Sequence, residues 1–211
     1  VCYLKSFWCR FLQKAAVPYC STTHAKIGNK NERNRDRFCS FAGIAKKERK
    51  KRRMVIELLV VGKTVGGWLE SGIREYTDRL GHYVRFGMSV IPELKNARNL
   101  REEQIKQTEG ELILSRLGGG DYVVLLDEGG WQPEGSEGFA AWLQRVMNRG
   151  TRRMVFVVGG AYGFSAAVYG RADEKLSLST LTYSHQMVRV IFVEQLYRAF
   201  TILAGEPYHH R

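Results

Sequence analysis

Apolar positions from residue 54 onwards follow two patterns that alternate along the chain. Compact apolar runs, such as "MVIELLVVG", occur at residues 54–62, 83–92, 121–130 and 153–163. Stretches with apolar residues three to four positions apart lie between and after them, at residues 67–81, 99–120, 136–150, 165–173 and 185–205. The compact runs predict strands buried on both faces, and the spaced pattern predicts helices. Ser136 and Ser165 stand where helix N-caps are expected.

This alternation predicts an α/β domain with a mostly parallel sheet and helices on both faces. In such sheets, ligands bind at the carboxyl ends of the strands. Three turns rich in glycine or small residues stand at predicted strand ends: "LDEGG" at 126–130, "VGGAYG" at 158–163 and "LSLSTLTY" at 176–183. If their strands are neighbours in the sheet, these turns converge on one site.

The turn at residues 158–163 lies between a strand and a helix, as a dinucleotide-binding loop does, but its spacing differs. Gly159, Gly160 and Gly163 read GGxxG, whereas the dinucleotide fingerprint requires GxGxxG. The pattern therefore disfavours a nicotinamide-dependent dehydrogenase. Glycines here would let the backbone approach a ligand, but a purely structural tight turn fits equally well.

Residues 175–183 alternate leucine with serine and threonine, which allows two interpretations. As a strand, the segment would be half-buried at an edge of the sheet. As a loop, its exposed backbone N–H and C=O groups would read the edge of an adenine-like base, which requires paired donors and acceptors. The spacing alone favours the strand.

The net charge of +12 belongs entirely to the first quarter of the chain. Residues 1–53 hold 15 Lys and Arg against 3 Asp and Glu, and residues 54–211 hold 18 of each sign. All four cysteines also precede Met54, in spacings that match no zinc site. We expect residues 1–53 to be a disordered extension or sequence upstream of a native start at Met54; a transit peptide is the less favoured alternative. For residues 54–211 we expect a reduced, cytoplasmic domain without a metal or a membrane segment.

Five segments of the chain resemble one known family. They are "MVIELLVVGK", "EYTDRLGHY", "VVGGAYGF", "LSLSTLTYSHQMVRVIFVEQLYRAF" and "GEPYHH", and they are similar to the RlmH family across residues 54–211. The resemblance implies a SPOUT-class fold with a C-terminal trefoil knot. It also implies a homodimer that uses S-adenosylmethionine to methylate N3 of a pseudouridine in 23S rRNA of the 70S ribosome. The turn "GGAYG" departs from the family's commoner "GGPEG" or "GGSNG" but keeps the glycines.

The resemblance also implies site residues. The cofactor would lie against residues from all three strand-end turns: Leu126, Gly159, Leu178, Ser179, Thr180, Leu181, Thr182 and Tyr183. Tyr208, His209 and Arg211 match the family's C-terminal Tyr-His-basic ending, which the resemblance places over the active site. We therefore expect these three residues to be catalytic, with the imidazole handling a proton.

Four further residues are candidates for contact with the RNA: His185, Arg189, Arg198 and His210. His185 alternatively caps the last helix, and each arginine alternatively forms a salt bridge. Glu194 stands four residues before Arg198, which favours a structural pair. The last helix is apolar over most of its circumference, which favours a homodimer contact.

A non-enzymatic RNA-binding or ribosome-associated module is the competing hypothesis, with the basic residues 1–53 as its RNA contact. Such a module needs no S-adenosylmethionine pocket. Calorimetry with the cofactor therefore separates the two hypotheses.

Overall fold

The computed structural model describes residues 54–94 and 100–209, and it confirms the alternation of strands and helices. In this range the strands are β1 (Val55–Val61), β2 (Arg85–Ile91), β3 (Tyr122–Trp131), β4 (Arg153–Val158) and β5 (Glu174–Leu176). The helices are α1 (Gly67–Leu80), α2 (Glu102–Arg116), α3 (Gly135–Asn148), α4 (Ala166–Arg171) and α5 (Met187–Ala204). Residues 1–53, His210 and Arg211 lie outside the described residues, so the predictions for them stay predictions.

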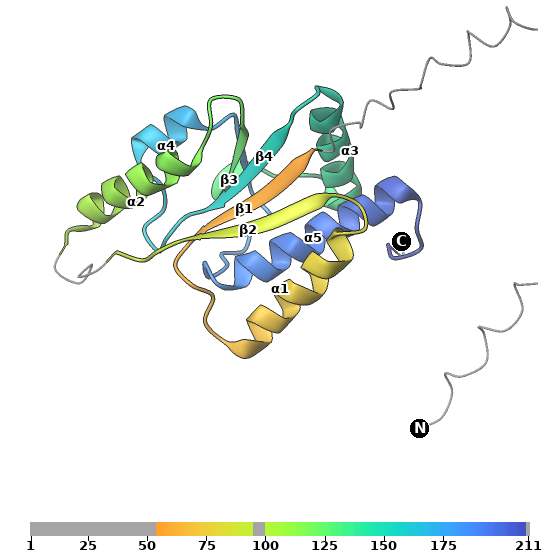
Figure 1. Ribbon diagram of the computed structural model, residues 1–211, viewed down its shortest axis with the longest axis horizontal. Helices are drawn as coiled ribbons and strands as arrows, with labels where there is room; N and C mark the ends of the chain where they lie inside the picture. Colours follow the sequence, from red (N-terminus) through yellow and green to blue (C-terminus); the bar gives the residue numbers. More distant parts are fainter. Residues whose placement is uncertain (1–53, 95–99, 210–211) are drawn as a thin grey trace, which may run out of the picture. The chain divides into compact units, whose positions relative to one another are not determined.

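The strands form one sheet in the order β2-β1-β4-β3-β5, and each neighbouring pair is parallel. Their carboxyl ends, and the turns that follow, therefore lie along one edge of the sheet (Figure 1). The central strands β1 and β4 are mostly buried, whereas β2 at the edge is mostly half-buried. The mostly parallel α/β sheet that the pattern predicts is confirmed.

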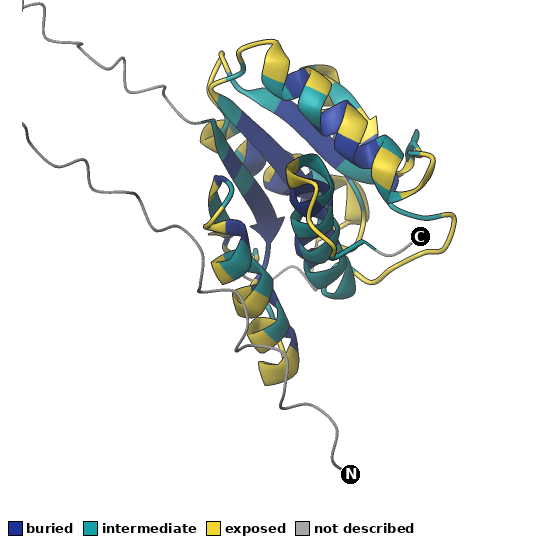
Figure 2. Cartoon of the chain, turned by 90° about the vertical axis from the view of Figure 1, so that its right-hand side faces the viewer, coloured by how far each residue is buried: buried dark blue, intermediate teal, exposed yellow. Residues whose placement is uncertain are grey.

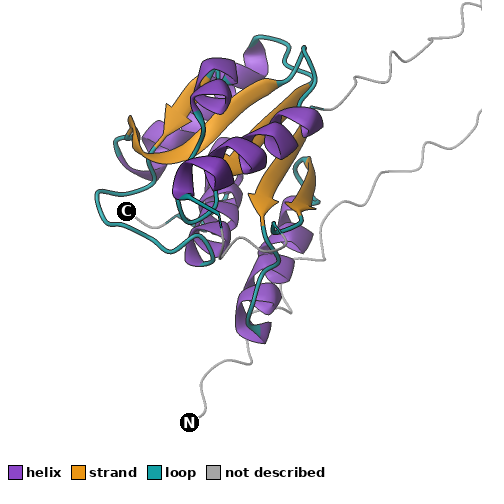
Figure 3. Ribbon diagram, turned by 90° about the vertical axis from the view of Figure 1, so that its left-hand side faces the viewer, coloured by secondary structure: helices purple, strands orange, loops and turns teal. Residues whose placement is uncertain are grey.

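Helices cover both faces of the sheet, as predicted. On one face, α1, α3 and α5 pack around a core that includes Phe156 and Leu196. On the other face, α2 and α4 pack over a smaller core that includes Val155, Val157 and Ile113. Successive residues of β4 thus enter opposite cores, which explains why this strand is apolar almost throughout. Figures 2 and 3 show the buried strands between the two layers of helices.

The two predicted helix caps had different outcomes. Ser165 caps α4, because its Oγ accepts a hydrogen bond from Val168 N at 3.4 Å. The prediction for Ser136 is wrong, because α3 begins at Gly135 and Ser136 lies inside its first turn. The Ser136 hydroxyl instead donates to Gln195 Oε1 at 3.2 Å, which links α3 to α5.

The strand interpretation of residues 175–183 holds only at the beginning of the segment. β5 ends at Leu176, and residues 177–186 lead into α5 without strand or helix. The structure therefore agrees with the loop interpretation, in which backbone groups stay unpaired in the sheet. The threading of this loop into a trefoil knot stays a prediction.

Candidate functional site

The candidate site lies where three neighbouring strands end in register. Leu126 of β3 pairs with Val158 of β4 on one side and with Leu176 of β5 on the other. The three turns singled out in the sequence start at these positions, so the structure brings them together. They enclose a pocket of about 350 Å³, a size typical of sites for small ligands.

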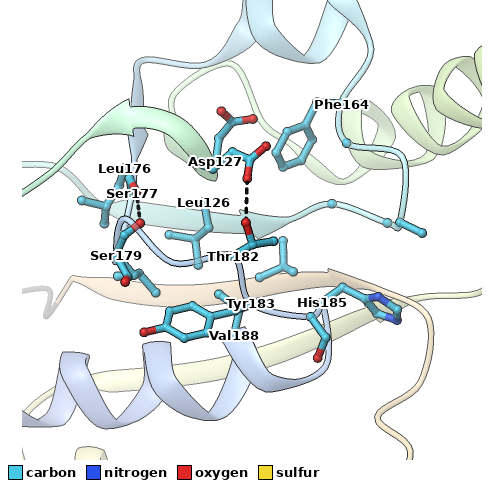
Figure 4. Close-up of a pocket in the computed structure, with 18 of the residues that line it drawn as sticks. Leu126, Asp127, Phe164, Leu176, Ser177, Ser179, Thr182, Tyr183, His185 and Val188 are labelled. Carbon is cyan, nitrogen blue, oxygen red and sulfur yellow. Dashed lines mark hydrogen bonds between the residues drawn. The ribbon is translucent and has the colours of Figure 1, made fainter.

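Seven of the eight residues predicted to bind a cofactor line this pocket: Leu126, Gly159, Leu178, Ser179, Leu181, Thr182 and Tyr183. Thr180 belongs to the same loop but is not one of the lining residues. His185, predicted to contact RNA, also lines the pocket. In Figure 4, Ser177 and Ser179 lie at one end of the group and His185 at the other.

An excursion of β3 makes one wall of the pocket. The pairing of β3 with β5 jumps from Leu126 to Trp131, both opposite Leu176, so residues 127–130 leave the ladder. Gly130 permits this path, because a Cβ there would lie 2.6 Å from the backbone nitrogen of Leu176. The residues of the excursion thereby reach the pocket.

Asp127 and Glu128 of this excursion give the pocket a negatively charged wall. Asp127 Oδ2 accepts a hydrogen bond from the Tyr169 hydroxyl at 2.6 Å. Burial, and then this bond to Asp127, raises the pKa of Tyr169 to about 12, so the hydroxyl remains a donor at neutral pH. Glu128 Oε2 accepts from Thr182 Oγ1 at 3.5 Å, which ties the excursion to the loop before α5. Two carboxylates in one wall favour a cationic ligand.

The glycine turn makes another wall, and its first two glycines face different neighbours. A Cβ on Gly159 would lie 3.2 Å from the ring of Phe164, which also lines the pocket. A Cβ on Gly160 would lie 2.5 Å from Glu109 Oε2 on α2. A larger residue at Gly159 would therefore disturb the pocket by moving Phe164.

Arg189 is fully buried and has no surface for an RNA phosphate, which corrects the prediction for it. Its guanidinium donates to the carbonyl oxygens of Val61 at 2.7 Å and Gly62 at 3.0 Å. It also donates to Thr64 Oγ1 at 3.1 Å and to His185 O at 2.9 Å. Burial lowers the pKa of Arg189, and these bonds replace part of the lost hydration. The side chain thus joins the end of β1 to the start of α5.

Ser184, rather than His185, satisfies the first backbone donor of α5. Its Oγ accepts a hydrogen bond from Met187 N at 3.2 Å. The capping interpretation of His185 is therefore not supported, and its place is the pocket wall.

The tail after α5 packs back onto that helix. Tyr83 donates to Glu206 Oε2 at 2.5 Å, and Tyr208 donates to Glu194 Oε1 at 3.2 Å. The predicted pair of Glu194 and Arg198 is confirmed, with 3.0 Å between Nε and Oε1. Arg198 also lies over the Tyr208 ring, 4.9 Å from its centroid. An RNA contact by Arg198 would have to share its guanidinium with these two partners.

The tail and the pocket are separate within one chain. Neither Tyr208 nor His209 lines the pocket, and His209 Nε2 lies 3.9 Å from Glu137 Oε1 on α3. With 18 residues, α5 is about 27 Å long; Val188 in its first turn adjoins the pocket, and the tail follows its last turn. One chain alone therefore does not bring the predicted catalytic residues to the predicted cofactor site.

Two negative findings concern the described part of the chain. Residues 54–94 and 100–209 hold no group of three or more His, Cys, Asp or Glu side chains arranged for a metal ion. None of the helices in these ranges is long and apolar enough to cross a membrane.

Comparison with known sequences agrees with the site. The family model described as "Predicted SPOUT methyltransferase" matches residues 54–209. The chain belongs to the SPOUT methyltransferase family. The match starts at the residue where the excess of positive charge ends, and it includes all three turns of the pocket.

Three SPOUT relatives share the name Ribosomal RNA large subunit methyltransferase H. The protein of Christiangramia forsetii is 57% identical over 158 residues, which cover 75% of this chain and 100% of the relative. That of Parabacteroides distasonis is 55% identical, with 74% and 99% covered. That of Flavobacterium johnsoniae is 52% identical, with 75% and 100% covered. The resemblance to the RlmH family is thereby confirmed.

Sequence reasoning missed several residues of this SPOUT site. Asp127 and Glu128 stand in the "LDEGG" motif, which was recognised as a strand end, so the motif itself holds the signal for them. Phe164 and Glu109 carry no such signal. Glu109 lies in a different helix, far from Gly160 in the sequence, and only the fold brings the two together.

Proposed function

We propose that the chain transfers the methyl group of S-adenosylmethionine to N3 of a pseudouridine in 23S rRNA. The observation that carries this proposal is the pocket at the ends of β3, β4 and β5, where seven of the eight expected cofactor residues meet. The shared name of the relatives supports large-subunit ribosomal RNA as the substrate. With the ribosome as substrate, the protein would act in the cytoplasm.

The pocket fits S-adenosylmethionine in shape and in charge. The loop at residues 177–183 is not paired in the sheet, so its backbone can match the donors and acceptors of an adenine edge. When bound, the cofactor supplies a methyl group on a positively charged sulfur. Asp127 and Glu128 place negative charge in the same pocket, which favours this cation over the product without the sulfonium.

The reaction requires alignment, exclusion of water and removal of one proton. The N3 lone pair forms the bond to the methyl carbon while the carbon–sulfur bond breaks and its electron pair stays on sulfur. The N3 proton passes to a base. The glycine turn and the loop at 177–183 enclose the reacting atoms, which aligns them and keeps water out.

We propose further that a second copy of the chain completes the site. Three apolar side chains around the start of α5 are largely exposed: Val65 at 70%, Trp68 at 65% and Leu181 at 70%. Gln186 orders this region, since it accepts from Val65 N at 3.1 Å and donates to Lys63 O at 3.0 Å. A two-fold contact here would cover the apolar side chains. It would also let the tail of one protomer serve the pocket of the other.

In this dimer, His209 of the partner subunit is our candidate for the proton acceptor, because imidazole titrates near neutrality. Tyr208 packs against Glu194 and Arg198, so we assign it to aiming the tail. Arg211 and His210 would hold RNA phosphate. His185 would contact the RNA from the pocket wall.

The proposal is tested by calorimetry with S-adenosylmethionine and by transfer of labelled methyl to 70S ribosomes that lack the modification. We expect saturable binding, and incorporation at a pseudouridine of 23S rRNA located by mass spectrometry. Cofactor binding without transfer to ribosomes or free 23S rRNA would contradict the assigned substrate. The competing RNA-binding hypothesis predicts ribosome binding without cofactor binding.

A further inference from the structure

A buried carboxyl group lies behind the glycine turn of the pocket. Glu109 of α2 is 9% exposed, and its Oε2 has no hydrogen-bond partner among the described residues. Burying an unpaired carboxyl lowers stability, whereas an apolar side chain of similar size would not. Stability therefore gives no reason for a glutamate at this position.

This carboxyl group is in contact with the turn itself. A Cβ built on Gly160 would lie 2.5 Å from Glu109 Oε2 and 3.0 Å from Cδ and Oε1. Gly160 also lines the pocket. The backbone of the turn thus separates the carboxyl group from the ligand space, and no side chain fits between the two.

The next residue of α2 supports the other end of the same segment. A Cβ on Gly110 would overlap Ser165 Oγ, so α2 and the end of the turn are in close contact there. Ser165 directly follows the turn and caps α4. Glu109 and Gly110 therefore hold the segment from Gly160 to Ser165 from behind.

Local charges favour the neutral form of this carboxyl group. Burial raises the pKa of Glu109, and the negative charge of Glu93, which follows β2, raises it further. A neutral carboxyl group can pack against backbone at a lower desolvation cost than a carboxylate. This is consistent with a group whose task is contact rather than charge.

We infer that Glu109 is a positioning residue that sets how far the turn at Gly159–Gly163 projects into the pocket. The inference rests on the proposed function for the identity of the ligand, S-adenosylmethionine. Added bulk between Gly160 and Glu109 would push the turn into the pocket, and a shorter side chain at 109 would let it fall back. Both changes alter affinity without touching the ligand.

Gly160→Ala, Glu109→Ala and the double variant test the inference by calorimetry with S-adenosylmethionine. Gly160→Ala forces a methyl group against the carboxyl group, so we expect the Kd to rise about tenfold or more. Glu109→Ala removes the support, and we expect a rise of about threefold to tenfold. In the double variant the methyl group takes space that the carboxyl group left, so the Kd should return to within about threefold of the unmodified chain.

Three control variants separate contact from general disturbance. Gly170→Ala adds a methyl group on α4, where a Cβ meets nothing within 4 Å. Glu111→Ala removes an exposed carboxylate from the same face-changing helix α2. Both should leave the Kd within about twofold. Glu109→Gln keeps the shape of the side chain and should leave the Kd within about threefold, which shows that shape matters more than ionisation.

Two results would overturn the inference: an unchanged Kd in Gly160→Ala, or losses that simply add in the double variant. Thermal unfolding of the same proteins without ligand shows whether affinity merely follows stability, which would also overturn it. If the unmodified chain binds no S-adenosylmethionine, the proposed function fails instead. The melting temperatures of the four proteins then decide by themselves whether Gly160 and Glu109 are coupled.

Discussion

The side chain of Arg189 is a buried cation whose partners are carbonyl and hydroxyl oxygens rather than carboxylates. It donates to Val61 O and Gly62 O at the end of β1, next to the pocket. Arg189→Met keeps the apolar stem but leaves these carbonyls without their donor. We expect the free energy of unfolding, measured by urea denaturation, to fall by about 2–4 kcal/mol.

Arg198→Met is the matched control for this prediction, because it removes the same group from the same helix. Arg198 is partly exposed and pairs with Glu194 four residues away. Such pairs contribute little, so we expect a loss of about 1 kcal/mol or less. Equal losses in the two variants would show that the buried bonds of Arg189 are not what holds α5 to β1.

Glu109→Gln should make stability less sensitive to pH. Burial raises the pKa of Glu109 above its ordinary value of 4.5, so the folded chain keeps this proton to a higher pH than the unfolded chain does. The associated stability is complete below 4.5 and is lost as pH rises through the folded pKa. The advantage of Glu109→Gln in free energy of unfolding should therefore grow between about pH 4 and pH 8. Urea denaturation across this range measures it, and Glu111→Gln, at an exposed site, should show no such trend.

Neither buried side chain could be assigned from the sequence. Arg189 finds one of its acceptors 127 positions earlier in the chain, and nothing local distinguishes it from a surface arginine. Glu109 occupies an ordinary polar position in a helical pattern. Periodicity shows which face of a helix is apolar, but the burial of a polar residue depends on neighbours from other elements.

At the scale of elements, the sequence was most informative where one pattern has one physical cause. β4 is apolar because both of its faces enter a core, and no helix or loop here shares that pattern. The alternation at residues 176–183 has two causes in common with a strand and a loop, so it misled. Leu178 packs against the core, but Leu181 is 70% exposed, which an inward strand face would not allow. The convergence of the three turns was predictable only on the condition that β4, β3 and β5 are neighbours.

Deleting residues 208–211 should separate cofactor binding from catalysis. Tyr208 contacts Glu194, Tyr197 and Arg198, and none of these lines the pocket. The Kd for S-adenosylmethionine should therefore stay within about threefold of the full chain. Single-turnover methylation of ribosomes should fall by about 10²-fold or more, because positioning and proton removal are lost together.

Tyr208→Phe is the milder companion of this deletion. It removes the hydrogen bond to Glu194 but keeps the ring under Arg198, so its loss of methylation should be smaller. Methylation that survives the full deletion would mean that the tail has no part in the site.

At the scale of the whole molecule, the charged extension and the methyltransferase domain should be separable. The family match starts at residue 54, and the relatives are covered almost completely by residues after it. A chain that begins at Met54 should therefore keep its melting temperature within about 2 °C and its turnover on 70S ribosomes within about twofold. It should also bind non-specific RNA more weakly, since 15 of the 33 Lys and Arg are removed. A large loss of turnover in this shortened chain would show that residues 1–53 contribute to the reaction.

Mixed dimers test whether the tail of one protomer serves the pocket of the other. One parent is the chain without residues 208–211, and the other carries Gly159→Val, which crowds Phe164 and should abolish cofactor binding. Each parent alone should be inactive. After equal amounts are mixed and allowed to exchange, half of the dimers should be mixed, and each has one complete site if tails act across the interface. Methylation should then recover to about a quarter of the unmodified level. If each tail serves its own pocket, no dimer of the mixture has a complete site, and activity stays at the level of the parents.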